Sequence, residues 1–168
     1  MLYYTPDLVN RWQSDYGEAS KEVYDQEWDD TQDAYERHFT TTEFPLSVRK
    51  FFNLVLHDEL VMSLPKATDV DNNVIGYFPN DDYIMVLSND RDDCVHILTY
   101  TLEKPPTIKH HSGHGFDSIE SDPVWLYDEF DLDDAGLFRH SVLFSNGMEL
   151  NVTFKSMHWL ECNVINKG

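Results

Sequence analysis

The residues with the clearest chemical capacity are His57, Asp58 and Glu59, which lie together in the otherwise apolar stretch LVLHDELVMSL. A histidine beside carboxylates is suited to proton transfer or to metal binding. No GxSxG nucleophile motif accompanies them in the sequence. We therefore favour a structural role, in which a helix ends near Leu56 and these polar side chains satisfy free backbone groups before a strand begins.

A second group consists of His110, His111 and His114, which lie close together in the segment KHHSGHG. Imidazole nitrogens bind zinc, copper or nickel, and a turn in this segment would bring two of them to one ion. No HExxH motif is present, and no carboxylate or thiolate completes a familiar ligand spacing. We expect a surface loop with weak metal affinity. The alternative is a metal-binding protein or metal-dependent enzyme that combines these histidines with His57 and Asp58.

A third group is the run of carboxylates in the segment YDEFDLDD. If this segment is a strand, Glu129, Asp131 and Asp133 share one face, whereas Asp128 lies on the other. The acidic face could hold a divalent cation or receive Lys and Arg side chains from a partner. A solvated edge that discourages the addition of another strand is the simpler explanation. In each case we expect these carboxylates to be exposed to solvent.

The elements that position these groups are helical in the first third of the chain. Thr5 can cap a helix that starts at Pro6. From Glu18 to Phe39, one apolar stripe follows helical spacing, whereas the other faces are acidic; its members are Tyr24, Trp28, Tyr35 and Phe39, with Thr31 between them. A third, short helix is expected to begin near Pro45.

After these helices the segments are short, rich in β-branched and aromatic residues, and separated by turns. The segments DYIMVLSN and CVHILTYTL are apolar on both faces, which places a hairpin centrally in a sheet. Asn146-Gly147 predicts a tight hairpin near the end of the chain. The sequence thus predicts one α+β domain over residues 1–168, with N-terminal helices (1–56) packed on an antiparallel β-meander (57–168) that forms a curled sheet or half-barrel.

The composition indicates a folded domain with an acidic surface. Of the 168 residues, 41% are hydrophobic, and 31 Asp and Glu against 12 Lys and Arg give a formal net charge of −19. Such a charge repels nucleic acids and anionic membranes and attracts basic proteins. Cys94 and Cys162 form no CxxC motif, and we recognise neither a signal peptide nor an apolar run of membrane-spanning length. We expect a cytoplasmic protein with no cofactor.

Three stretches carry a resemblance to a known family: MLYYTPDLVNRWQS, LVLHDELVMSL and LFRHSVLFSNGMELNVTF. Together they resemble a bacterial family of small acidic proteins, a domain of unknown function with a Leu-His-Asp turn ahead of its sheet. The same turn followed by a meander is also similar to what is seen in some small bacterial immunity proteins. Neither resemblance implies a catalytic residue in this chain.

We expect this protein to act by binding rather than by catalysis, and most concretely as an immunity- or inhibitor-type protein for a basic protein partner. The acidic helix and the acidic strand would supply charge complementarity and a fast, salt-sensitive encounter. Exposed aromatic side chains would anchor the partner. The expected partner-binding residues are Asp29, Asp33, Glu36, Trp125, Tyr127, Glu129, Asp131 and Asp133. Neither nucleic acid nor a membrane is an expected partner, and the oligomeric state is left open.

Overall fold

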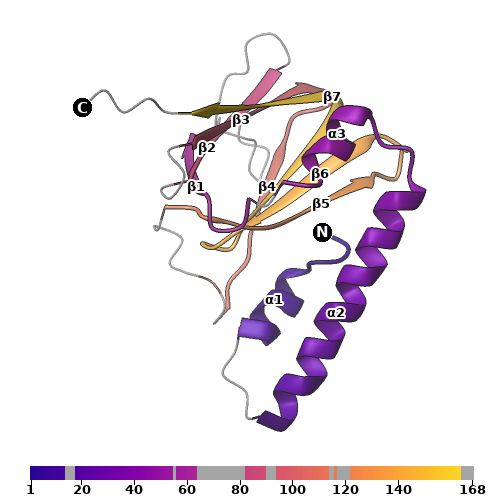
Figure 1. The fold of residues 1–168 in the computed structure, drawn as a ribbon, viewed down its shortest axis with the longest axis vertical. Helices are drawn as coiled ribbons and strands as arrows, with labels where there is room; N and C mark the ends of the chain where they lie inside the picture. The colour runs from indigo at the N-terminus through magenta and orange to yellow at the C-terminus, as the bar shows by residue number, and fades with distance from the viewer. Residues whose placement is uncertain are drawn as a thin grey trace.

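The predicted fold class is confirmed: helices come first and an antiparallel sheet follows (Figure 1). The computed structural model describes residues 1–13, 18–54, 56–63, 82–89, 94–113, 116 and 122–163. The helices are α1 (Pro6–Gln13), α2 (Glu18–Thr41) and α3 (Leu46–Phe51). The strands are β1 (Leu60–Ser63), β2 (Asp82–Asn89), β3 (Cys94–Leu102), β4 (Thr107–His110), β5 (Trp125–Leu132), β6 (Phe138–Phe144) and β7 (Met148–Asn163).

The helices begin where the sequence signals predict. The hydroxyl of Thr5 accepts a hydrogen bond from the amide of Leu8 at 3.3 Å, so it caps the first turn of α1. The apolar stripe of α2 ends in Tyr35 and Phe39, which are both buried. The Tyr35 hydroxyl accepts a hydrogen bond from the backbone amide of Phe130 at 2.7 Å. This bond occupies a donor on the outer edge of β5 and ties α2 to the sheet.

The sheet is antiparallel throughout, in the order β1-β2-β3-β7-β6-β5, and β4 adds to β7. The β2–β3 hairpin lies inside the sheet, as its two apolar faces predict. Strand β7 runs for 16 residues. Its first half pairs with β6 and β4, and its second half pairs with β3. One long strand therefore joins the two halves of the sheet.

The predicted hairpin between β6 and β7 is confirmed, and it depends on Gly147. The amide of Gly147 donates to the carbonyl of Phe144 at 3.0 Å, which closes the turn. Gly147 has a φ angle of 75°, in the left-handed region that favours glycine. A Cβ atom here would lie 2.2 Å from the carbonyl oxygen of His111, so a side chain has no room. The turn thus also fixes the end of β4.

The sheet curls until its two outer strands meet at one end, which makes it a half-barrel. The amide of Trp125 at the start of β5 donates to the carbonyl of Glu59 at 2.9 Å. The amide of Asp58 donates back to the carbonyl of Trp125, also at 2.9 Å. The His57–Glu59 turn is therefore the point at which the two edges of the sheet join.

The helices occupy different parts of this curled sheet. Helices α1 and α2 lie side by side beyond β5, whereas α3 packs against β7 (Figure 1). The main core lies between the sheet and α2 and α3, and it includes Phe51, Tyr100, Phe130 and Phe154, each at most 2% exposed. Among the described residues, no helix has the length and apolar character needed to cross a membrane.

Candidate functional site

The acidic face predicted on β5 is not exposed, and this expectation is wrong for two of its three carboxylates. Glu129 and Asp131 are 0% and 1% exposed. The Glu129 carboxylate accepts hydrogen bonds from the backbone amides of Leu2, Tyr3 and Tyr4. The N-terminal segment thereby covers the face that the alternation of the strand had assigned to solvent.

Asp131 and Asp133, which share this face with Glu129, pair with cations within the chain. Asp131 forms a bidentate pair with Arg139, which lies directly opposite on β6. Asp133 accepts hydrogen bonds from the amides of Ala135 and Leu137 and from the ammonium group of Lys104. These contacts, that of Lys104 first, lower the pKa of Asp133 to about 2. Both carboxylates therefore serve the fold.

Trp125 also lies where the sequence did not place it. It is 1% exposed and packs against Phe144 and His140, so it cannot be a surface anchor. Its bulk favours the core, and the pairing of β5 with β6 is irregular between Trp125 and Tyr127. Tyr127 is partly exposed, as an anchor requires.

The acidic residues predicted on α2 are at the surface. Asp29, Asp33 and Glu36 are all exposed. They follow one another at intervals of four and three residues, so they share one side of the helix. The same helix buries Tyr35 and Phe39 on a neighbouring side. Periodicity alone predicted this division correctly.

The histidines of the metal-site alternative do not gather in the described part of the chain. Nε2 of His111 donates to the carboxylate of Glu149 at 2.7 Å, and Nδ1 of His57 lies 3.0 Å from the carboxylate of Asp58. Within the described residues, His57, Asp58, His110 and His111 form no group with metal-binding geometry. His114 lies outside the described residues.

His57 lies in a turn, as expected, but this turn does not follow directly on a helix. Helix α3 ends at Phe51, not near Leu56, so His57 is not at a helix terminus. It belongs instead to the turn that joins the sheet edges, in which Asp58 has a φ angle of 72°. Aspartate tolerates this left-handed conformation better than most residues. The turn places the ring of His57 5.3 Å from that of Tyr127.

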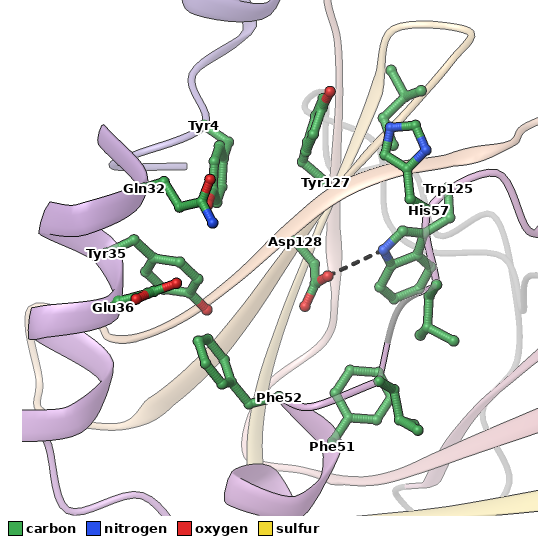
Figure 2. Close-up of a pocket in the computed structure, with 13 residues that line it drawn as sticks. Tyr4, Gln32, Tyr35, Glu36, Phe51, Phe52, His57, Trp125, Tyr127 and Asp128 are labelled. Atoms are coloured by element: carbon green, nitrogen blue, oxygen red, sulfur yellow. Dashed lines mark hydrogen bonds between the residues drawn. The ribbon is translucent and has the colours of Figure 1, made fainter. Parts of the chain in front are cut away.

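A pocket of about 280 Å³ opens beside this turn, between α2, the end of α3 and β5 (Figure 2). Three partly buried aromatic rings, those of Tyr4, Phe52 and Tyr127, contribute to its wall. Asp128 lies in the middle of the view in Figure 2, with Glu36 on the side of α2. The lining residues are Tyr4, Gln32, Tyr35, Glu36, Phe51, Phe52, Leu54, Leu56, His57, Trp125, Leu126, Tyr127 and Asp128.

Asp128 is held in place by a buried hydrogen-bond network that crosses the sheet. Its carboxylate lies 2.9 Å from Nε2 of His140 and accepts from Nε1 of Trp125 at 3.1 Å. Nδ1 of His140 lies 2.7 Å from the hydroxyl of Tyr100. Because a carboxylate only accepts, Nε2 of His140 donates to Asp128 and a neutral ring accepts the Tyr100 proton at Nδ1. The side chain of Asp128 itself is 27% exposed and faces the pocket.

The pocket has a negative electrostatic character. Burial, together with the charges of Asp128 and Glu36, raises the pKa of Tyr4 to about 12. Burial, followed by the charge of Asp128, likewise raises the pKa of Tyr35. Burial is the first cause in both cases, and the negative charge of Asp128 adds to it. The charges of Asp128 and Glu36 attract a cation, whereas burial opposes any charge that is not paired.

The arrangement is suited to the non-covalent binding of a cation. Carboxylates attract a positive charge, and the faces of aromatic rings attract it further when water is excluded.

Sequence reasoning missed Asp128 as a site residue, although one signal pointed to it. Asp128 shares a strand face with Phe130, and a carboxylate on a core-facing side must be hydrogen-bonded or border a cavity. Its partner His140 is fully buried on β6 and stacks on Phe130 with ring centroids 3.9 Å apart. Of the predicted residues, Glu36, Trp125 and Tyr127 do line the pocket.

Comparisons with family models, curated proteins and solved structures return no match for this chain. The resemblance to a bacterial family of small acidic proteins therefore stays a prediction, and so does the looser likeness to immunity proteins.

Proposed function

We propose that this protein binds a basic protein partner, in the manner of an inhibitor or immunity protein, and that the pocket at Asp128 receives a Lys or Arg side chain of that partner. The observation that carries the proposal is the pocket itself. It combines partly buried aromatic rings with the carboxylates of Asp128 and Glu36. A cationic side chain placed there gains both charge pairing and cation–π contact.

The rigidity of the pocket supports this function. Two N–H donors orient the Asp128 carboxylate from behind, so its remaining lone pairs face the pocket before any ligand arrives. Glu129 binds the amide of Tyr4 and so holds this ring at the pocket wall. A preformed site loses little conformational entropy on binding, which favours affinity.

The exposed carboxylates of α2 extend this negative region across the surface. Asp29 and Asp33 precede Glu36 on the same side of the helix. With a formal net charge of −19, the protein attracts a basic partner over distances comparable to the Debye length, about 8 Å at physiological salt. The encounter would therefore be fast and sensitive to ionic strength.

The test is a titration with two short capped peptides that differ only in one residue, arginine or its neutral isostere citrulline. Binding is followed by NMR through the indole N–H of Trp125, whose partner Asp128 lines the pocket. We expect the arginine peptide to shift this resonance saturably and the citrulline peptide to leave it unchanged. Affinity should fall as salt is raised.

Two variants separate the pocket from the general acidity of the surface. Glu36→Gln removes a charge that lines the pocket, whereas Asp33→Asn removes an equal charge from the preceding turn of α2. Glu36→Gln should weaken arginine binding by about three- to tenfold, and Asp33→Asn by less than about twofold. Equal binding of the citrulline peptide, or an equal loss in both variants, would rule out the pocket as the site.

A further inference from the structure

A second group of polar side chains lies at the N-terminal end of β3, away from Tyr100 and the pocket of the proposed function. Cys94 and His96 are alternate residues of β3, so they share one face of the sheet. Glu161 of β7 lies directly opposite His96 in the strand pairing. Donor atoms of these three residues all lie within 4.8 Å of one another.

The burial of the group is graded. Cys94 and His96 are 6% and 8% exposed, whereas the side chain of Glu161 is 52% exposed. Two of the three donors are thus fixed in the protein, and the third can adjust its rotamer from the surface. Such a site is accessible to an ion without unfolding.

His96 is oriented by a fourth residue. Nδ1 of His96 lies 2.9 Å from the carboxylate of Glu59, which is 1% exposed. Since a carboxylate only accepts, Nδ1 carries the proton and Nε2 of a neutral ring presents its lone pair toward Glu161. A carboxylate that holds the far nitrogen of a histidine is the usual second layer of a zinc site.

The separation of His96 and Glu161 fits a shared ion better than a direct contact. Nε2 of His96 and Oε2 of Glu161 are 3.8 Å apart, beyond the range of an N–H···O hydrogen bond. Two ligands of a tetrahedral zinc ion lie about 3.3–3.8 Å apart, given zinc–ligand bonds of about 2.0–2.3 Å. The separation of His96 and Glu161 is therefore already at the upper end of this range.

We propose that Cys94, His96 and Glu161 form a mononuclear site for a divalent transition-metal ion, with Zn²⁺ as the best fit and Glu59 as the residue that orients His96. Thiolate and imidazole ligands select zinc, cobalt or nickel over magnesium and calcium. Three protein ligands leave a fourth position for water, as in zinc sites with an open coordination position. This site involves none of the histidines that the sequence singled out.

The test uses the full chain without a histidine tag, titrated with CoCl₂ and then ZnCl₂. We expect one equivalent of Co²⁺ to bind, with the absorption of a thiolate-to-cobalt charge transfer and the intense visible bands of tetrahedral Co²⁺. One equivalent of Zn²⁺ should abolish both signals and raise Tm. Absence of the charge-transfer band at stoichiometric Co²⁺ would overturn the proposal.

Matched variants assign the ligands. Cys94→Ser should remove the charge-transfer band and weaken Co²⁺ binding more than 100-fold, whereas Cys162→Ser, at the neighbouring exposed thiol, should change neither. Glu161→Gln alters a largely exposed side chain, so the fold should be kept while binding weakens at least about tenfold. Glu59→Gln should weaken binding about 10- to 100-fold.

One further variant guards against adventitious binding. His110→Asn alters an exposed histidine of β4 and should leave Co²⁺ binding unchanged. If this change removes the binding and Cys94→Ser retains it, the ion is bound by His110 and the proposed site is wrong.

Discussion

The acidic residues of α2 and those of β5 look alike in the sequence, but the first are exposed and the second are buried. On α2, Asp29 and Asp33 are exposed. On β5, Glu129 and Asp131 are buried and hydrogen-bonded to other parts of the chain. A carboxylate on a solvated helix face stays hydrated, so it has no desolvation cost. A carboxylate on a covered strand face loses its water and needs hydrogen-bond donors around it. The same residue type therefore contributes surface charge in one region and internal acceptors in the other.

The largest expected effect comes from breaking the buried ion pair on β5. Arg139→Met leaves Asp131 buried without its bidentate partner and should lower the free energy of unfolding by about 3 kcal/mol. Urea denaturation measures this loss. Adding Asp131→Leu to the variant should restore most of it, because no unpaired charge is then left in the interior. A loss below about 0.5 kcal/mol in the single variant would show that Asp131 finds another partner.

A smaller effect is expected at Glu129, whose acceptors bind backbone amides and not a cation. Glu129→Leu leaves the amides of Leu2, Tyr3 and Tyr4 without this acceptor and should cost about 2 kcal/mol. Hydrogen exchange of these amides should become faster than in the wild type. Glu129→Gln keeps one oxygen acceptor and should lose about half as much. Unchanged exchange in the Leu variant would mean that ring packing alone holds the segment.

Asp133 should make the stability of the protein depend on pH. The hydrogen bond from Lys104 and those from the 133–137 turn lower its pKa to about 2. Because the pKa is depressed on folding, this stabilisation is present above the ordinary value of 3.8 and is lost as the pH falls through about 2. Asp133→Asn should lower Tm by a few degrees at pH 7, and the difference from the wild type should shrink toward pH 2. A difference that stays constant over this range would contradict the assignment.

The smallest effect on stability is expected on α2. Asp29→Asn and Asp33→Asn should each change the free energy of unfolding by less than about 0.5 kcal/mol, because both side chains are exposed. Urea denaturation of the double variant tests this directly. A loss as large as that of Arg139→Met would erase the distinction between the two acidic regions.

The period of a pattern was a reliable guide to which side chains share a face. Alternation on β5 separated Glu129 and Asp131 from Phe130, and the structure keeps this separation. It did not predict which face meets solvent, because the cover comes from Arg139 on the neighbouring strand and from Leu2 to Tyr4 at the start of the chain. The burial of a strand face is decided by what packs on it, and no local signal carries that information.

The two candidate sites were predictable to different degrees. Glu36 and Tyr127 were chosen for charge and aromatic character, and both line the pocket. The Cys94-x-His96 spacing was readable as a pair on one strand face, but its third member, Glu161, is set only by the register of β3 against β7. Register depends on the whole hydrophobic pattern and on turn geometry, so distant ligands cannot be assigned from spacing.

The sequence by itself determined the α+β class, the caps and turns at Thr5 and Gly147, and the acidic face of α2, because each depends on residues within a few positions of one another. Only the tertiary structure decided which carboxylates are buried, that the His57–Glu59 turn joins the sheet edges, and that Asp128 borders a pocket. These features depend on contacts between segments far apart in the chain, where the cost of burying a charge is met by donors that the local sequence does not contain.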